Sequence, residues 1–338
     1  MFNKYLKLKE DLGERLKENE LMAVHTTFKI GGPARFYFEA QDTGEIVLAV
    51  NLCQKLELPY FILGGGSNLL VSDQGFSGLV IKNKTKKIKI LGYQGKIQKA
   101  KRKIDKLFIE VESGVLTNTL VRQTIEEELE GLETFLGLPG TVGGAVYTNA
   151  HFKDKSIGDF LESATILGLN GEIKKVDNFY LHFYYDQSIL QKTGEVLLTA
   201  VFKLTGGEKE ILWEKAQEAL DWRQKNHHYD LPSAGCIFRN IKKSEALRLG
   251  TPDLTQSAGF LIEAVGLRGK TFGGAKISCD HANFIVNLGG ASASDVIELI
   301  NLAKVKVKEK FGMNLKEEII YLSPTGVKNS VGQKDLNG

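Results

Sequence analysis

The sequence is poor in the residues and runs that mark several classes of protein. Its 338 residues include only three cysteines, Cys53, Cys236 and Cys279, and no CxxC pair, which argues against a disulfide framework and a zinc ribbon. The longest run without charge, residues 134–152, holds four glycines and a proline, so it lacks the apolar continuity of a membrane span. A hydrophobic share of 42% and a charged share of 25% exclude a wholly disordered chain.

Targeting signals are also missing from the sequence. The first twenty residues are charged along their length and contain no apolar core, so we expect no signal peptide. The six histidines include no pair at i, i+4, so a metalloprotease-type zinc helix is excluded and we expect no metal site. Together with the scarce cysteine, these features predict a cytoplasmic protein that does not enter a membrane.

Charge of one sign is concentrated in a single segment. The formal net charge is only +3, but residues 82–106 hold eleven Lys and Arg and one acid, which leaves −7 for the rest of the chain. Gly92 and Gly95 suggest that this segment is a hairpin with its tip near them. Charge attracts phosphate without specifying it, and the segment has one aromatic residue, Tyr93, for base stacking. We therefore expect a solvated lysine-rich hairpin (82–106) and no nucleic-acid partner.

Hydrophobic periodicity predicts a mixed α+β chain in two domains. We predict helices over 5–19, 43–56, 117–129, 208–226, 257–265 and 294–311, and strands over 36–40, 59–63, 79–81, 88–91, 107–111, 164–169, 172–176, 195–204, 236–238, 284–287 and 318–322. Asn170-Gly171 joins two of these strands in a hairpin. Ser292 or Ser294 is expected to cap the last helix, Gly206-Gly207 to mark a domain boundary, and the polar tail from Ser323 to lack order.

Two glycine clusters carry most of the functional information. GGGSN at 64–68 follows a predicted strand, and GLPGTVGGA at 137–145 has four glycines. Glycine lets backbone N–H groups approach a ligand closely, and successive N–H groups in a turn form a nest for an anion such as pyrophosphate. One such cluster is most simply a turn; two in one domain favour phosphate binding.

Common phosphate and hydrolase motifs do not fit. A dinucleotide fingerprint that begins at Gly64 needs glycine at 69, where Leu69 stands. A Walker A loop that ends in Gly269-Lys270-Thr271 needs glycine at 264, where Ala264 stands. No GxSxG elbow occurs, so the common serine hydrolases are unsupported.

Ordered motifs along most of the chain resemble one family. The segments HTTFKIGGPARFYFEA (25–40), LGGGSNLLVSDQGFSGLVI (63–81), GLPGTVGGAVYTNA (137–150), LPSAGCIFRN (231–240), SAGFLIEAVGLRGKTFGGAKISCDHANFIVN (257–287) and NLKEEI (314–319) resemble the UDP-N-acetylenolpyruvoylglucosamine reductases, also called UDP-N-acetylmuramate dehydrogenases or MurB proteins, of the compact second type. The resemblance spans roughly residues 22–322, so it is far more specific than one glycine loop.

The resemblance implies a fold and a division of the chain. It implies an α+β protein with a two-part FAD-binding domain of the vanillyl-alcohol-oxidase/PCMH type and a C-terminal α+β substrate-binding domain. We accordingly expect an N-terminal helix at 1–21, the FAD-binding domain at 22–206 with the lysine-rich hairpin inside it, the substrate-binding domain at 207–323, and a flexible tail at 324–338.

The resemblance also implies a reaction. NADPH would reduce FAD, and the enolpyruvyl group of UDP-N-acetylglucosamine enolpyruvate would then be reduced to give UDP-N-acetylmuramate for peptidoglycan precursor synthesis. Such an oxidoreductase serves cell-wall biogenesis and, through it, cell shape and cell division. The flavin supplies the hydride chemistry, and the protein supplies position, a proton and charge stabilisation. A UDP-sugar enolpyruvyl substrate is thus the expected partner, and we expect a monomer.

Roles of single residues follow from the same resemblance. Cys236 stands where the family has Ser or Cys as proton donor, and a thiol is mostly protonated at neutral pH. Glu318 matches a glutamate at the carboxylate end of the substrate, whereas neighbouring Glu317 fits an exposed surface residue better. The predicted substrate-binding residues are Tyr185, Arg239, Asn240, His281 and Asn283. The predicted FAD-binding residues are Gly64, Gly65, Gly66, Ser67, Asn68, Gly140, Thr141, Gly143, Gly144 and Ala145.

Two further cysteines and two glycines have simpler interpretations. Cys53 lies in a helical pattern of apolar residues and is expected in the core, and Cys279 has no assigned role. Gly31 and Gly32 are expected to shape the chain where the FAD-binding domain begins.

The sequence departs from the family where charge matters most. The family's Y-R-x-S motif places a catalytic arginine at position 186, where this chain has Asp186 between Tyr185 and Ser188. Nearby, the small glycine-containing stretch that follows Asn149-Ala150 in the family is replaced by residues 151–154, HFKD. Arg239, Lys192 or Arg223 could replace the missing cation, the alignment could be locally shifted, or turnover could be poor.

Four classes of function therefore stay open at this point. The reductase is favoured, and the motifs at 233–240 and 280–287 argue against a flavoprotein oxidase or dehydrogenase with another substrate. Asp186 keeps open a catalytically weak or inactive homologue that binds flavin and a nucleotide sugar. A nucleic-acid binder that uses the lysine-rich hairpin is the fourth class.

Overall fold

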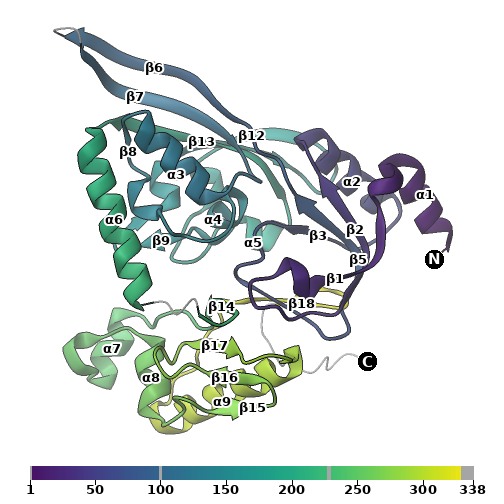
Figure 1. Ribbon diagram of the computed structural model, residues 1–338, viewed down its shortest axis with the longest axis vertical. Helices are drawn as coiled ribbons and strands as arrows, with labels where there is room; N and C mark the ends of the chain where they lie inside the picture. Colours follow the sequence, from purple (N-terminus) through teal and green to yellow (C-terminus); the bar gives the residue numbers. More distant parts are fainter. Residues whose placement is uncertain (1, 99–100, 227–229, 329–338) are drawn as a thin grey trace. The chain divides into compact units, whose positions relative to one another are not determined.

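The computed structural model describes residues 2–98, 101–226 and 230–328, and the chain forms two compact units (Figure 1). Unit 1 consists of Met1–Leu16, Phe38–Gly65 and Val80–Lys225, and unit 2 consists of Lys17–Tyr37, Gly66–Leu79 and Asn226–Gly338. The chain passes from one unit to the other after Leu16, within β2 (Pro33–Ala40), after Gly65, within β5 (Phe76–Asn83) and after Lys225. The division therefore does not follow one cut in the sequence.

Unit 1 is built around an antiparallel sheet in the order β12-β11-β13-β7-β6, with β8 beside β13. The strands of unit 1, inside and outside this sheet, are β3 (Tyr60–Leu63), β6 (Ile88–Gln98), β7 (Lys101–Glu112), β8 (Leu129–Glu130), β9 (His151–Phe152), β10 (Lys155–Ser156), β11 (Leu161–Leu167), β12 (Ile173–Asp177) and β13 (Val196–Gly206). Its helices are α1 (Phe2–Leu12), α2 (Thr43–Lys55), α3 (Thr117–Glu126), α4 (Val142–Thr148), α5 (Leu190–Thr193) and α6 (Lys209–Asn226).

Buried apolar side chains from both helices and strands form the core of unit 1. Val111 and Phe202 come from the sheet, Leu120 from α3, Val146 from α4 and Ala216 from α6. Because α6 contributes to this core, unit 1 extends past the boundary expected at residues 206 and 207, up to Lys225. Helix α6 belongs to unit 1 because its apolar face is buried there, and the glycine pair before it does not mark the domain boundary.

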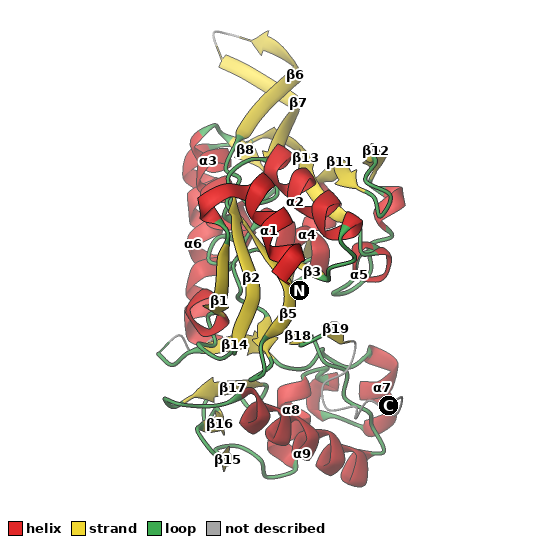
Figure 2. Ribbon diagram, turned by 90° about the vertical axis from the view of Figure 1, so that its right-hand side faces the viewer, coloured by secondary structure: helices red, strands yellow, loops and turns green. Residues whose placement is uncertain are grey.

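Unit 2 contains a sheet in the order β14-β17-β16-β15 and a three-stranded sheet in the order β19-β18-β4. Helices α8 and α9 lie beside the first of these sheets (Figure 2). Its elements are β1 (Lys17–Leu21), β4 (Leu69–Val71), β14 (Ser233–Cys236), α7 (Lys243–Leu249), α8 (Ala258–Ala264), β15 (Thr271–Phe272), β16 (Ala275–Ile277), β17 (Phe284–Asn287), α9 (Ala293–Phe311), β18 (Ile320–Ser323) and β19 (Gly326–Lys328).

Several local predictions are confirmed by the structure. Asn170-Gly171 joins β11 and β12 with Leu167 opposite Ile173, and Gly171 has a φ of +80° that suits glycine. Helix α9 begins after Ser292, whose hydroxyl accepts a hydrogen bond from Asp295 N at 3.0 Å. Cys53 is fully buried, and this burial raises the pKa of its thiol to about 12.

The predicted N-terminal helix is too long. Helix α1 ends at Leu12, because Gly13 takes a φ of +66°, a conformation that ends helices. Residues 17–21 of the expected helix at 1–21 instead form β1, which pairs antiparallel with β2. Backbone pairing with a distant strand thus overrides the amphipathic pattern.

The predicted start of the flexible tail is also wrong. Residues 326–328 form β19 against β18, and Ser323 Oγ donates a hydrogen bond to Gly326 O at 2.7 Å across the turn. This hydrogen bond and the pairing of β18 with β19 give residues 323–328 a defined structure, although their polar composition predicted a flexible tail. Residues 329–338 of the expected tail lie outside the described residues.

The lysine-rich hairpin is confirmed in part: β6 and β7 form a hairpin that extends well beyond the neighbouring strands (Figure 1), but it begins at Ile88, and Lys82 and Asn83 belong to β5. Gly92 and Gly95 do not form its tip, because Gln98 pairs with Lys101 further along. The two glycines lie instead at shifts in the strand register, where an extra residue has to be accommodated. The predicted tip at these glycines is therefore wrong.

Candidate functional site

The two glycine clusters meet in unit 1. A Cβ atom on Gly65 would lie 2.6 Å from Gly140 Cα, and one on Gly64 would lie 2.6 Å from Thr141 Oγ1. Neither position tolerates a larger residue without movement, because Cβ contacts that short are not found in proteins. Segments about 75 residues apart in the sequence are thus packed closely against each other at these glycines.

A lysine that was not among the predicted site residues lies at this junction. Lys82, in β5, donates a hydrogen bond from Nζ to Gly64 O at 2.5 Å. Burial lowers the pKa of Lys82 to about 8, and the positive charge of Lys84 lowers it further. In the sequence, Lys82 follows the apolar residues of a predicted strand, which could have marked it as partly buried. It was instead counted as one of the many lysines of the segment 82–106.

The glycines at the start of α4 serve the fold. Gly143 N donates to Ser113 O at 2.8 Å, and a Cβ on Gly143 would lie 2.9 Å from the same oxygen. Gly144 N donates to Thr141 Oγ1 at 3.3 Å, and Ala145 N to Thr141 O at 2.9 Å. Since these N–H groups are used inside unit 1, any contact of Gly143, Gly144 and Ala145 with a cofactor would be through shape rather than through backbone donors.

Three of the predicted motifs meet in unit 2. Thr27 N donates to Gly66 O at 3.1 Å, and Thr27 Oγ1 donates to Ser233 O at 2.7 Å. A Cβ on Gly66 would lie 2.3 Å from His25 O, so glycine is required there. The segment at 25–40 therefore fixes both the end of the GGGSN loop and the strand that leads to Cys236.

The segment around Cys236 is clamped by the amide of Asn283. Cys236 lies at the end of β14 opposite Phe284 and is half-buried. Asn283 Oδ1 accepts from Phe238 N at 2.9 Å, and Asn283 Nδ2 donates to Phe238 O at 2.7 Å. Both polar ends of this buried amide are thus occupied by backbone, so Asn283 holds the segment in place.

Glu318 lies beside the same segment. Glu318 N donates to Ile237 O at 2.8 Å, and Arg239 N donates to Lys316 O at 2.9 Å, so the chain around Glu318 pairs with the chain that follows Cys236. Asn68 Nδ2 donates to Glu318 O at 3.2 Å. The predicted catalytic residues Cys236 and Glu318 are therefore on neighbouring segments of unit 2.

Two buried polar atoms near these paired segments of unit 2 have no partner among the described residues. They are Asn68 Oδ1 and Arg239 Nε. An unpaired buried donor or acceptor costs about 1–3 kcal/mol, so such atoms commonly mark the place of a ligand or a water. Both belong to residues predicted to bind cofactor or substrate.

The remaining predicted residues of unit 2 are partly engaged in the fold. His281 Nδ1 accepts a hydrogen bond from Asn283 N at 3.2 Å, and its ring contacts that of Phe284 at 4.9 Å. Asn240 Oδ1 accepts from Ala258 N at 3.1 Å, next to the start of α8. Ser67 lies in the turn between Gly66 and Asn68.

Asp186, the main departure from the family, is buried in unit 1 and paired. Its Oδ1 lies 3.0 Å from His151 Nδ1, and its Oδ2 is buried without a hydrogen-bond partner among the described residues. The ring of His151 also contacts the ring of Tyr185, with centroids 4.6 Å apart. The two departures from the family, at 151 and at 186, therefore contact each other.

The alternative cations are not equivalent. Arg223 is buried in unit 1, where Nη1 donates to Thr134 O at 2.9 Å and to Leu136 O at 2.7 Å, and its guanidinium lies over the ring of Phe152. It is a structural residue, so its proposed role as a replacement cation is wrong.

Glu317, in unit 2, is not the exposed surface residue that was expected, since it pairs with Lys304 and its side chain is only 8% exposed.

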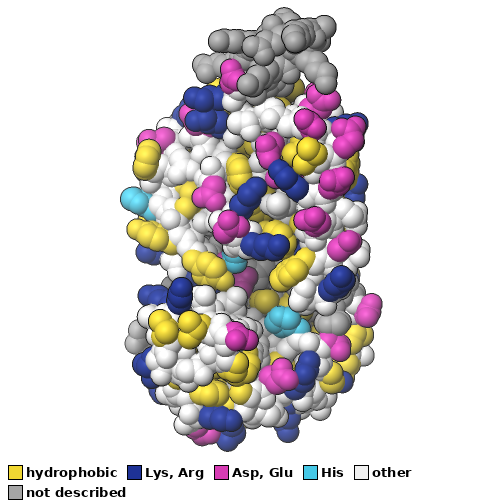
Figure 3. Space-filling model, turned by 90° about the vertical axis from the view of Figure 1, so that its left-hand side faces the viewer, with side chains coloured by type: hydrophobic (Ala, Val, Ile, Leu, Met, Phe, Trp, Pro, Cys, Tyr) yellow, Lys and Arg dark blue, Asp and Glu magenta, His cyan; other side chains and the backbone are white. Residues whose placement is uncertain are grey.

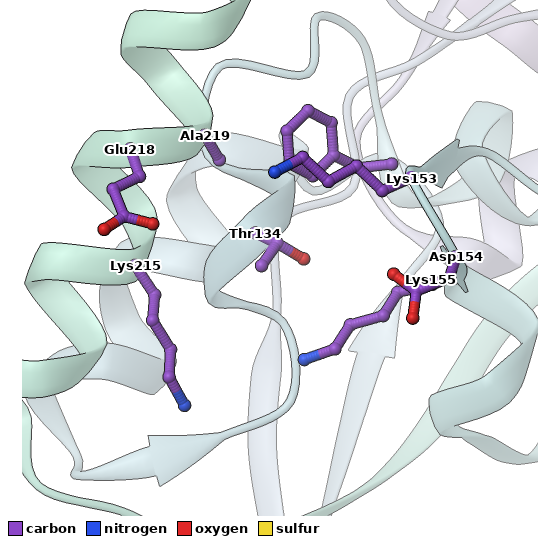
Figure 4. A pocket seen from close by; sticks show the side chains of 8 residues that line it. Thr134, Lys153, Asp154, Lys155, Lys215, Glu218 and Ala219 are labelled. Atoms are coloured by element: carbon purple, nitrogen blue, oxygen red, sulfur yellow. The ribbon is translucent and has the colours of Figure 1, made fainter. Parts of the chain in front are cut away.

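A shallow pocket of about 110 Å³ lies elsewhere in unit 1 (Figure 4). It is lined by Thr134, Phe152, Lys153, Asp154, Lys155, Lys215, Glu218 and Ala219. None of the predicted site residues lines it, and two of its lysines are neutralised by Glu130 and Glu133. Within residues 2–98, 101–226 and 230–328, no group of three or more His, Cys, Asp or Glu could hold a metal ion.

Comparisons with known proteins agree on one family. Residues 34–177 match the FAD binding domain family, and residues 226–322 match the C-terminal domain of UDP-N-acetylenolpyruvoylglucosamine reductase. The UDP-N-acetylenolpyruvoylglucosamine reductase of Anoxybacillus flavithermus is 38% identical over 323 residues, which cover 93% of this chain and 97% of the relative. The enzyme of the same name numbered 1 in Bacillus cereus is 38% identical over 313 residues, with 92% and 96% covered.

A solved structure supports the same conclusion. The UDP-N-acetylenolpyruvylglucosamine reductase (MurB) of Thermus caldophilus is 32% identical to this chain, with a TM-score of 0.68 and coverage of 89% of this chain and 97% of that one. The expected fold, an FAD-binding domain together with a C-terminal α+β domain of the reductase family, is thereby confirmed. The chain belongs to the UDP-N-acetylenolpyruvoylglucosamine reductase family.

Proposed function

We propose that this chain uses NADPH and FAD to reduce the enolpyruvyl group of UDP-N-acetylglucosamine enolpyruvate to UDP-N-acetylmuramate, as a cytoplasmic step of peptidoglycan precursor synthesis. The proposal rests on one observation in unit 2: Cys236, Arg239 and Glu318 lie on two backbone segments that are hydrogen-bonded to each other. Family membership supports the same reaction class.

The residues of unit 1 fit a flavin dinucleotide. Gly64, Gly65 and Gly140 have no Cβ atom and lie where the two loops pack together, so the backbone there can approach a pyrophosphate closely. Bound to the glycine loops of unit 1, FAD would pass a hydride equivalent from NADPH to the substrate.

The chain's own residues then have distinct tasks. Addition of hydride to the distal enolpyruvyl carbon moves the electron pair of the double bond toward the adjacent carbon and the carboxylate. Cys236 Sγ–H would donate a proton to that adjacent carbon, which completes the reduction of the double bond. Arg239, whose Nε has no partner among the residues that the structure describes, would bind an anionic group of the substrate, and Glu318 would assist at its carboxylate end.

An anaerobic experiment in two stages tests this proposal. The purified protein should be yellow with the absorbance of oxidised flavin, NADPH should bleach it, and the enolpyruvyl sugar nucleotide should then restore the colour. Colourless protein that cannot be reconstituted with FAD would refute flavin binding. Bleaching without reoxidation would refute reduction of the sugar nucleotide and leave only a flavoprotein that NADPH reduces.

A further inference from the structure

The pair formed by Asp186 and His151 is built into unit 1 rather than left by chance on its surface. Asp186 has a φ of +53°, a conformation that Asp tolerates better than most residues, and its side chain is only 6% exposed. Gln191 Nε2 donates to Asp186 O at 3.1 Å and to Tyr147 O at 2.9 Å. The loop that carries Asp186 is thereby fastened to α4.

The segment that carries His151 is fastened to the same place. Asn149, which ends α4 with a φ of +49°, donates from Nδ2 to Tyr184 O at 2.9 Å and accepts on Oδ1 from Gly158 N at 3.1 Å. Ser188 Oγ donates to Tyr147 O at 2.7 Å. Hydrogen bonds on both sides of the pair therefore fix the distance of 3.0 Å between His151 Nδ1 and Asp186 Oδ1.

Each member of the pair has one polar atom left over. Asp186 Oδ2 is buried without a hydrogen-bond partner, and no hydrogen bond of His151 Nε2 is found among the described residues. The side chain of His151 is 28% exposed, so its second nitrogen can reach a ligand. A carboxylate on one ring nitrogen fixes the direction in which the other nitrogen points.

We propose that His151, positioned by Asp186, donates a hydrogen bond from Nε2 to the enolpyruvyl carboxylate and so performs the task that the resemblance assigns to an arginine at position 186. When hydride adds to the distal carbon, negative charge collects on the adjacent carbon and its carboxylate. His151 stabilises that charge without giving up its proton. The inference rests on the proposed function.

The first test separates the two stages of the reaction. In His151→Ala, flavin content and reduction by NADPH should stay unchanged, and reoxidation by the enolpyruvyl sugar nucleotide should slow roughly 10- to 100-fold, as expected for the loss of one charged hydrogen bond. His151→Gln keeps an N–H donor and should recover part of that rate. The matched control is His182→Asn, since His182 is exposed and already has a positive φ of 43° that Asn tolerates.

Variants at position 186 test the positioning role. Asp186→Asn keeps an acceptor for His151 Nδ1 and suits the positive φ, so reoxidation should slow only a few fold. Asp186→Arg removes that acceptor and places a bulky residue at a φ of +53°, so reoxidation should slow at least as much as in His151→Ala. Faster reoxidation in Asp186→Arg than in the unmodified chain would overturn the inference.

A second readout does not depend on turnover. The ring nitrogens of ¹⁵N-labelled histidine are followed by NMR in the oxidised flavoprotein as UDP-N-acetylmuramate is added, and the Nε2 signal that is missing in His151→Gln should shift. An unmoved signal, or a His151→Ala rate within twofold of the unmodified chain, sinks the inference while the proposed function stands. If the unmodified chain itself is not reoxidised, the proposed function and this inference fail together.

Discussion

At the scale of single residues, chemistry depends on which polar atoms the fold leaves available. Asn283 and Arg239 both have side chains suited to a substrate, yet Asn283 uses both ends of its amide on Phe238 whereas Arg239 Nε has no partner in the described part of the chain. Residue type alone does not distinguish these two cases. Hydrogen-bond satisfaction does, because a buried donor without a partner is costly unless a ligand occupies it.

Replacement of Cys236 by alanine should separate the two stages of the proposed reaction. NADPH should still reduce the flavin of Cys236→Ala, because no thiol is needed to accept hydride. Reoxidation by the enolpyruvyl sugar nucleotide should slow by about 10²- to 10⁴-fold, the usual contribution of a general acid. Stopped-flow absorbance of the flavin measures both stages.

Cys279→Ala is the matched control, since Cys279 is exposed and has no assigned role. It should behave like the unmodified chain in both stages. Equal reoxidation rates in Cys236→Ala and Cys279→Ala would show that another group supplies the proton.

Lys82 should make stability depend on pH in the alkaline range. Burial lowers its pKa from the ordinary 10.5 to about 8, so between these values the unfolded chain holds a proton that the folded chain has lost. The contribution of this group to the free energy of unfolding therefore rises with pH from about 8 to 10.5, and it does not change below about 8, where both states hold the proton.

Comparison with Lys82→Met isolates that contribution from those of other groups. Urea unfolding at pH 7.5 and at pH 10 should show the unmodified chain gaining stability relative to Lys82→Met at the higher pH. A difference between the two proteins that does not change with pH would contradict the lowered pKa.

At the scale of elements, the structure places two separate caps on the long helix of unit 2. Ser292 Oγ accepts from Asp295 N at 3.0 Å, as the sequence predicted. In addition, Asp73 accepts from Ala293 N at 2.6 Å and from Ser294 N at 2.9 Å, from a position 220 residues away in the sequence. Local spacing identifies the first cap, but only tertiary packing supplies the second.

Removal of the local cap should have a modest cost. Ser292→Ala should lower the free energy of unfolding by about 1 kcal/mol, since it leaves Asp295 N without its acceptor while Asp73 still holds its two N–H groups. Ser244→Ala, at an exposed position inside α7, is the control and should change little. Equal urea midpoints for the two variants would argue against the cap.

At the scale of the whole molecule, the basic charge is a local property of one hairpin. Lys84, Lys86, Lys87 and Lys89 are exposed on the described part of the lysine-rich hairpin. On the face shown in Figure 3, Lys and Arg side chains are interspersed with Asp and Glu. No helix within residues 2–98, 101–226 and 230–328 is long and apolar enough to cross a membrane.

Shortening the hairpin should therefore change charge without changing cofactor binding. Deletion of residues 93–104 removes five positive charges and no acid, which changes the formal net charge from +3 to −2. Flavin content and NADPH oxidation should be retained, and retention on a cation-exchange column should fall. Loss of flavin from the shortened chain would show that the hairpin supports the glycine loops.

Some features were predictable because they depend on neighbours in the sequence. The turn at Asn170-Gly171 needs only a residue that tolerates positive φ between two alternating strands, and the start of α9 needs only Ser292 with Asp295 three residues later. The buried Cys53 follows from helical periodicity in the same way. The glycine loops and the segment around Cys236 were identifiable because their motifs are long and ordered.

Other features depend on residues that the sequence does not place together. Residues 17–21 form a strand rather than part of a helix because they pair with β2. Helix α6 belongs to unit 1 because its apolar face is buried in the core of that unit. The sequence by itself determined the family and the positions of the glycine loops. Only the tertiary structure decided that Asp186 faces His151, because a contact between residues 35 positions apart is set by packing and hydrogen bonds rather than by local propensity.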